Sequence, residues 1–186
     1  MGELGPDILS VGVVIVAILS VGIYKFIVEK RAAKAMDRML DSLETAPDDL
    51  LLGETGDVAI GWVESGEHFV YLNTFSDSIR KIEKDEIQAI DVQENGLLIR
   101  HLILTGERKT MSEELASAAN SLLPENVSDK IERLEIIVKT KQGGPPMGYN
   151  IPVVEHSRSS ESSDYKMLRD TVVETTNRWR EVSGLS

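Results

Sequence analysis

The segment at 8–24 (ILSVGVVIVAILSVGIY) constrains the fold of this chain most, because no residue in it is charged. If Lys25 reaches its ammonium group toward the headgroup layer, the apolar stretch runs on to Val28. Its 21 residues then form about 31 Å of helix, close to a hydrocarbon thickness of about 30 Å. The sequence therefore predicts a transmembrane helix at 8–28.

A secretory signal peptide is the nearest alternative to this span. The preceding MGELGPD, however, carries Glu3 and Asp7 in place of a basic region, and no A-x-A cleavage site follows. Basic residues are absent before the span and frequent after it (Lys25, Lys30, Arg31, Lys34, Arg38). The positive-inside rule thus predicts a short extracytoplasmic tail at 1–7 and a C-terminal part on the cytoplasmic side of the inner (cell) membrane.

Composition excludes several classes of function. The 186 residues suffice for one domain and an appendage, which rules out a large multidomain enzyme. With 31 acidic against 20 basic residues, the net charge of -11 argues against nucleic acid as a partner, because phosphate binding needs clustered Lys and Arg. There is no Cys, and the three His are scattered, so we expect no cofactor and no metal site.

A helical stalk and linker are predicted at 29–56. After the span, EKRAAKAMDRMLDSLE contains good helix formers, and Ala32, Met36, Met39 and Leu43 recur at helical spacing. This stripe is either a short self-association seam or a surface that packs against the chain's own domain. The segment TAPDDLLLGETGD at 45–57, with its Pro, Gly and acidic residues, indicates a linker.

The period changes to alternation from Asp57, which predicts a β domain at 57–186. The opening hairpin turns at 64–67, and Asn95-Gly96 is the clearest hairpin signal. A short helix is predicted at Ser112–Leu123, and a final helix begins near Ser163 or Asp164 and carries Trp179 on its apolar face. The predicted strands are Asp57–Val63, His68–Asn73, Ile79–Ile82, Ile87–Val92, Leu97–Leu104, Leu134–Thr140 and Tyr149–Val154.

Five segments show this order of short antiparallel strands and one closing helix: AIGWVESGEHFVYLN, IEKDEIQAIDV, LEIIVKT, YNIPVV and the helix with Trp179. On these, the chain from about Asp57 to Leu185 resembles the pleckstrin-homology-like (PH-like) domains of uncharacterised bacterial proteins. The resemblance implies an α+β fold: an N-terminal transmembrane helix, then a small antiparallel PH-like β-barrel or sandwich capped by a C-terminal helix. The predicted helix at 112–123 departs from the minimal arrangement.

No group of residues predicts catalysis. His156 with Ser157, Ser159 and Ser160 would be the only base and nucleophile for a hydrolase, but neighbours on one loop seldom reach triad geometry. Solvent-facing roles explain the other polar candidates, which are His68, His101, Asp48-Asp49, Asp85-Glu86 and the Gly143–Pro146 loop. Lipid headgroup binding is disfavoured, because the first hairpin loop is acidic.

The sequence thus predicts a non-catalytic, single-pass membrane-anchored cytoplasmic module that binds another protein or acts as a scaffold. Its expected partners are the lipid bilayer, through the N-terminal helix, and a protein whose segment binds at an exposed strand edge or in the groove beside the final helix. The candidate contact regions are the loop at 143–148 and the Ser-rich stretch at 156–164. Two alternatives stay open. One is a structural homo-oligomer joined through the stalk stripe, and the other is a Ser/His hydrolase using His156.

Overall fold

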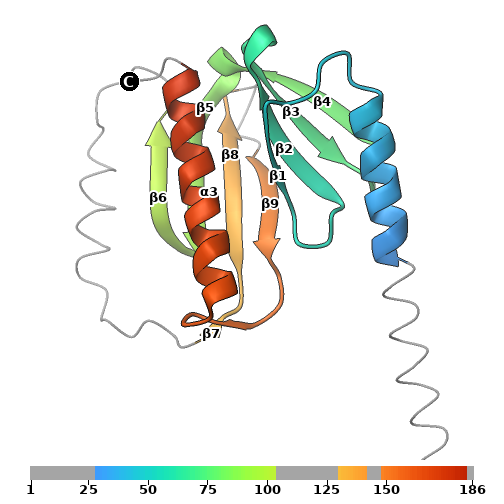
Figure 1. Ribbon diagram of the computed structural model, residues 1–186. Coiled ribbons are helices and arrows are strands. Elements are labelled where there is room, and N and C mark those ends of the chain that lie inside the picture. The colour runs from blue at the N-terminus through green and yellow to red at the C-terminus, as the bar shows by residue number, and fades with distance from the viewer. Residues whose placement is uncertain (1–27, 104–129, 142–147, 184–186) are drawn as a thin grey trace, which may run out of the picture.

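The computed structural model describes residues 28–103, 130–141 and 148–183, which form two antiparallel four-stranded sheets, one short two-stranded sheet of β7 and β10, and two α-helices (Figure 1). The first sheet has the order β1-β2-β3-β4 and the second has the order β6-β5-β8-β9. A helix at 28–41, called the N-terminal helix below, precedes the first sheet. The elements are β1 Asp49–Leu52, β2 Val58–Val63, η1 Glu64–Gly66, β3 His68–Asn73, β4 Ser78–Glu83, η2 Lys84–Glu86, β5 Ile87–Glu94, β6 Leu97–Ile103, β7 Lys130–Ile131, β8 Leu134–Thr140, β9 Gly148–Val154, β10 Arg158–Ser159 and α3 Ser163–Val182.

The main core lies where α3 packs against both sheets. Figure 1 shows α3 lying over the second sheet, between β6 and β8 in this view, and its Trp179 is fully buried. Trp179 meets Phe69 of β3 edge to face at 5.3 Å between ring centroids, and Phe69 meets Trp62 of β2 at 4.8 Å. Aromatic side chains bury large apolar areas, so this trio joins the helix to the first sheet. Ser162 caps α3 by accepting from the Tyr165 N–H at 3.2 Å, one residue before the predicted cap.

A second, smaller apolar cluster lies on the other face of the first sheet. Successive strand residues point to opposite faces, so Ile60 and Trp62 of β2 enter the main core while the residues between and beside them face away. The N-terminal helix covers that outer face. The buried members of the second cluster are Met36, Met39, Ala59, Val63, Val70 and Leu72. Because both of its faces are covered, every residue of β2 is buried, which explains its lack of charged side chains.

The stalk stripe therefore has a partner within the chain. Met36 and Met39 are 3% and 6% exposed, and Leu43 packs beside them. Of the two readings of the stripe, the structure shows packing against the chain's own sheet. The predicted linker at 45–57 is wrong in part, because Asp49–Leu52 form β1 and pair with β2 from Asp49↔Trp62 to Leu52↔Ala59.

The predicted fold class needs correction. The α+β class and the C-terminal helix hold, but in the described residues the strands form two open four-stranded sheets and one short two-stranded sheet, and none closes into a barrel. The second correction concerns the membrane helix: across 28–103, 130–141 and 148–183, no helix combines the length and apolarity needed to cross a bilayer. The predicted span at 8–28 lies outside the described residues apart from Val28, as do the predicted helix at 112–123 and most of the loop at 143–148.

Candidate functional site

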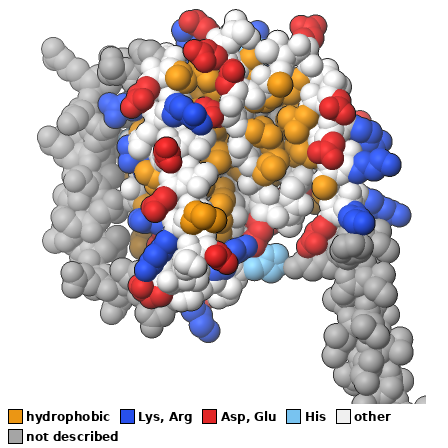
Figure 2. Space-filling view, viewed as in Figure 1, with side chains coloured by type: hydrophobic (Ala, Val, Ile, Leu, Met, Phe, Trp, Pro, Cys, Tyr) orange, Lys and Arg blue, Asp and Glu red, His pale blue; other side chains and the backbone are white. Residues whose placement is uncertain are grey.

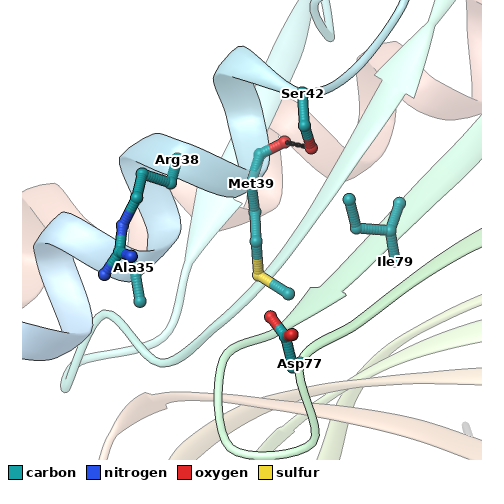
Figure 3. Close-up of a pocket in the computed structure, with 6 residues that line it drawn as sticks. All are labelled: Ala35, Arg38, Met39, Ser42, Asp77 and Ile79. Atoms are coloured by element: carbon teal, nitrogen blue, oxygen red, sulfur yellow. Dashed lines mark hydrogen bonds between the residues drawn. The ribbon is translucent and has the colours of Figure 1, made fainter.

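An open groove lies between the N-terminal helix and the end of the β3–β4 hairpin (Figure 3). It has a volume of about 330 Å³. In Figure 3 the Met39 side chain extends from the helix toward Asp77, with Ile79 of β4 beside it. The lining residues are Ala35, Arg38, Met39, Ser42, Asp77 and Ile79. We call this the hairpin groove.

The hairpin groove exists because the N-terminal helix covers β2 and β3 but leaves β4 open. Leu72 of β3 and Ile79 of β4 are cross-strand partners on the same face of the sheet. Leu72 is fully buried under the helix, whereas Ile79 is 44% exposed. The apolar surface of the sheet therefore extends one strand further than the helix that covers it.

A second exposed apolar side chain stands on the turn that joins β3 to β4. Phe75 is 81% exposed, although the backbone around it is well held. The Asn73 side-chain oxygen accepts from the N–H groups of Phe75 and Ser76 at 3.0 and 3.2 Å, and the Thr74 N–H donates to the Asp57 carbonyl at 2.8 Å. An Asx-type turn of this kind fixes the backbone locally. The ring of Phe75 is thus presented to solvent by an ordered turn.

The polar groups of the hairpin groove are mostly engaged by their own elements. The Ser42 hydroxyl donates to the Met39 carbonyl at 2.7 Å, the contact drawn dashed in Figure 3. The Arg38 side chain donates from Nε to the Lys34 carbonyl at 3.2 Å. None of the six lining residues is a histidine or a cysteine. The hairpin groove thus has apolar walls and a polar rim, which suits the binding of an apolar side chain. Its lining residues include no activated nucleophile.

Apolar side chains also gather on the face shown in Figure 2, in the space between α3 and the N-terminal helix. On β1, the edge of the first sheet opposite β4, Leu52 is 47% exposed and Leu50 is partly buried against the second cluster. Together with Ile79 and Phe75 these residues show that the smaller cluster is incompletely covered on both edges of the first sheet.

His156, the residue of the hydrolase hypothesis, belongs to a polar cluster around Glu54. The Glu54 carboxylate accepts from the backbone N–H groups of Glu155 and His156, lies 3.2 Å from the His156 ring Nδ1, and accepts from Arg158 at 2.6 Å. Burial alone would raise the pKa of Glu54, but the hydrogen bonds from Arg158, Glu155 and His156 outweigh it and lower the pKa to about 2. This cluster ties the β1–β2 turn to the segment after β9.

The serines beside His156 have local roles where the structure shows their contacts. The Ser159 hydroxyl accepts from the Glu161 N–H at 3.3 Å, which is a turn contact. Ser162 caps α3. The Ser-rich stretch at 156–164 is thus built around the start of α3, and its role as a contact region stays a prediction.

His101 lies in a buried polar group on the second sheet. Asp91 of β5, 2% exposed, pairs with the His101 ring from β6 and with the Lys139 ammonium group of β8 at 2.6 Å. The Lys139 ammonium group and the His101 ring nitrogen compensate for burial of this carboxylate. His68 is half-buried on β3 opposite Glu83.

The acidic pairs singled out in the sequence make structural contacts or lie in a short helix. Asp48 accepts from the Glu64 N–H at 2.7 Å, and Asp49 pairs with Arg178 of α3. Asp85 and Glu86 lie in η2. Throughout the part of the chain that the structure describes, His, Asp and Glu side chains do not gather in threes that would hold a metal ion.

Comparison of the sequence with protein-family models, with curated proteins and with solved structures gives no match. The resemblance to PH-like domains therefore stays a prediction from the sequence pattern. The described architecture defines the chain only as an α+β module with two open four-stranded sheets, a short two-stranded sheet and an apolar hairpin groove.

Sequence reasoning missed the hairpin groove. Met39 and Ile79 are forty positions apart, and no local pattern joins them. One signal was present: Phe75, a large aromatic residue in a turn between two strands, serves no local need of the turn.

Proposed function

We propose that this chain is a non-catalytic protein-binding or scaffold module that receives its partner at the hairpin groove. The observation that carries the proposal is the pair of exposed apolar side chains on the β3–β4 hairpin: Ile79, which lines the hairpin groove and is 44% exposed, and Phe75 on the adjoining turn, which is 81% exposed. An apolar surface of this kind, held on ordered backbone and bordered by charged residues, is typical of a protein-interaction site.

The proposed location is the cytoplasmic face of the cell membrane, and its support comes from the sequence. The charge-free segment at 8–24 and the basic residues that follow it favour an anchor with the described residues inside. Alkaline carbonate should leave the chain in the membrane pellet, and protease added outside intact cells should spare a C-terminal tag. Extraction by carbonate or digestion of the tag would contradict this part of the proposal.

The oligomer alternative rested on the apolar stripe of the stalk, and the N-terminal helix uses this stripe to pack against the first sheet. Met36 and Met39 are already buried against the first sheet, so a stalk seam between copies would first require undocking of the N-terminal helix. Mass photometry of the solubilised full-length chain tests this alternative, which predicts a multimer.

The test of the binding proposal is site-specific photo-crosslinking in cells with the full-length chain. A photoreactive residue is placed at position 75 or 79 and, as a matched control, at Met167, which is 68% exposed on α3. We expect one discrete protein adduct from 75 and 79 that is absent from 167. The adduct from position 75 should disappear when the groove residue Ile79 is made polar, as in Ile79→Asp. Equal labelling from all three positions would contradict the proposal.

A further inference from the structure

Strand β4 forms an open edge of the first sheet beside the hairpin groove. It has six residues, of which Ile79, Arg80, Lys81 and Glu83 are exposed. Its one pairing within the described residues is to β3, so its other side presents backbone N–H and C=O groups with no described strand to receive them. Such an edge is a template for an added strand.

An added strand would complete the hairpin groove. It would lie about 4.8 Å beyond β4, with every second side chain on the face that carries the N-terminal helix. Ile79 and Lys81 point to that face, because they alternate with Arg80 and Ile82. A side chain placed opposite Ile79 would therefore lie beside Ile79, on its far side from Met39, at the open margin of the hairpin groove.

A second copy of this chain fits the β4 edge poorly. In a regular antiparallel pairing of two copies of β4, only every second residue directs its N–H and C=O outward, so residues of the same parity lie opposite each other. The two registers with the largest overlap therefore place Arg80 opposite Arg80 or Lys81 opposite Lys81. Like charges directly opposite each other destabilise a strand pair, so these two registers disfavour a second copy.

The positive charges of Arg80 and Lys81 favour a partner strand that carries acidic residues opposite them. Along the chain, Asp77, the Arg80-Lys81 pair and Glu83 give the order acidic, basic, basic, acidic. Lys81 and Glu83 contact each other at 3.0 Å, yet both side chains remain about half exposed, so they can pair with an incoming strand. Arg80 lies on the opposite face, 5.7 Å from the centroid of the Tyr149 ring.

Building on the binding role proposed above, we propose that β4 takes up an extended segment of a partner protein as a fifth strand of the first sheet. The segment has two adjacent acidic residues opposite Arg80 and Lys81, flanked by apolar residues opposite Ile79 and Ile82. The apolar side chain opposite Ile79 packs against the exposed Ile79 at the margin of the hairpin groove, and backbone hydrogen bonds along β4 hold the segment. Its central pattern, apolar-acidic-acidic-apolar, reads the same in both directions.

The test uses the full-length chain in mild detergent and two labelled peptides, KVEEVTK and EVKKVTE. Both peptides have zero net charge, so the overall negative charge of the chain affects them equally. By fluorescence anisotropy we expect KVEEVTK to bind about tenfold more tightly than EVKKVTE, a difference that salt reduces. The double variant Arg80→Glu/Lys81→Glu should reverse this order while keeping the melting temperature of the parent. Equal affinities, or an unchanged order in the variant, would overturn the proposal.

Backbone pairing is tested with two N-methylated forms of KVEEVTK, each methylated at alternate residues. In an added strand only one alternate set of N–H groups faces β4. We expect one form to lose about tenfold or more in affinity and the other to bind as KVEEVTK does. Retention of affinity by both forms would overturn strand addition. Analytical ultracentrifugation showing a dimer that the charge-reversal variant abolishes would mean that a second copy occupies the edge.

The two proposals fail in different ways. If the crosslinker at 79 captures a discrete partner in cells but KVEEVTK neither binds nor competes with it, the binding role stands and strand addition is wrong. If no adduct forms at 75 or 79, the binding role itself is wrong.

Discussion

The two apolar clusters of this molecule differ in how completely they are closed. The main core is covered by the long helix α3 and contains two tryptophans that are 1% or less exposed. The smaller cluster is covered by the N-terminal helix through two methionines, and its cover stops short of β4, where Ile79 is 44% exposed. A closed core contributes mainly to stability, whereas an incompletely covered sheet face leaves apolar surface available for a partner.

The largest expected effect is in the main core. Trp179→Ala removes the fully buried ring that joins α3 to Phe69, and large-to-small changes at such sites cost about 3–5 kcal/mol of unfolding free energy. Urea denaturation followed by circular dichroism measures the loss. A cost below about 1 kcal/mol would mean that α3 is not the principal cover of the core.

A smaller effect is expected in the second cluster. Met39→Ala removes a 6% exposed side chain, but the adjoining groove already admits solvent and lets the site relax, so we expect a loss of about 2 kcal/mol. The matched control, Met167→Ala on the exposed face of α3, should stay within about 0.5 kcal/mol of the parent. Losses of equal size at the two methionines would contradict the assignment of Met39 to a buried cluster.

The Glu54 cluster ties the edge of the first sheet to the segment before α3, and its contribution depends on pH. The pKa of Glu54 is lowered from 4.5 to about 2 in the folded chain, so the carboxylate stabilises the fold above pH 4.5, and this contribution is lost as the pH falls toward 2. Glu54→Gln should cost about 1–2 kcal/mol at pH 7. In urea titrations the difference from the parent should shrink between pH 4.5 and 2, and a constant difference would contradict the lowered pKa.

The smallest effect on stability is expected at the turn. Phe75→Ser should change the unfolding free energy by less than about 0.5 kcal/mol, because the ring is 81% exposed and the Asn73 contacts that hold the turn remain. The same variant should weaken the crosslink from position 79 in cells. A clear loss of stability with an unchanged crosslink would place Phe75 in the fold and remove it from the binding site.

Local patterns predicted the strands well. His68–Asn73 and Leu134–Thr140 have the predicted bounds, and the turn at Asn95-Gly96 joins β5 to β6 as expected. These segments alternate or carry turn residues whose backbone preferences act over a few positions. The structure places both Asn95 and Gly96 at positive φ, which this pair adopts readily.

The missed features depend on contacts between distant parts of the chain. Residues 50–52 of β1 lie between acidic residues and Gly53. These neighbours are typical of a linker, so the sequence predicted a linker over the whole of 45–57. The strand conformation of 50–52 comes from pairing with β2. The division into two open sheets and the groove between Met39 and Ile79 likewise follow from which strands pair and which face a helix covers, and hydrophobic periodicity does not encode either.

Docking of the N-terminal helix onto β2 and β3 fixes the geometry at the entrance to the domain. Met36 and Met39 are buried against the sheet, so the helix is fixed to β2 and β3. A force applied at residue 28 therefore acts directly on those strands and is not taken up by a flexible linker. Each residue of an α-helix rotates the chain by about 100° around the helix axis. Inserting one alanine between 30 and 35 would therefore rotate the residues before the insertion by about 100° relative to β4. The direction in which the hairpin groove faces is thus set by helical phase.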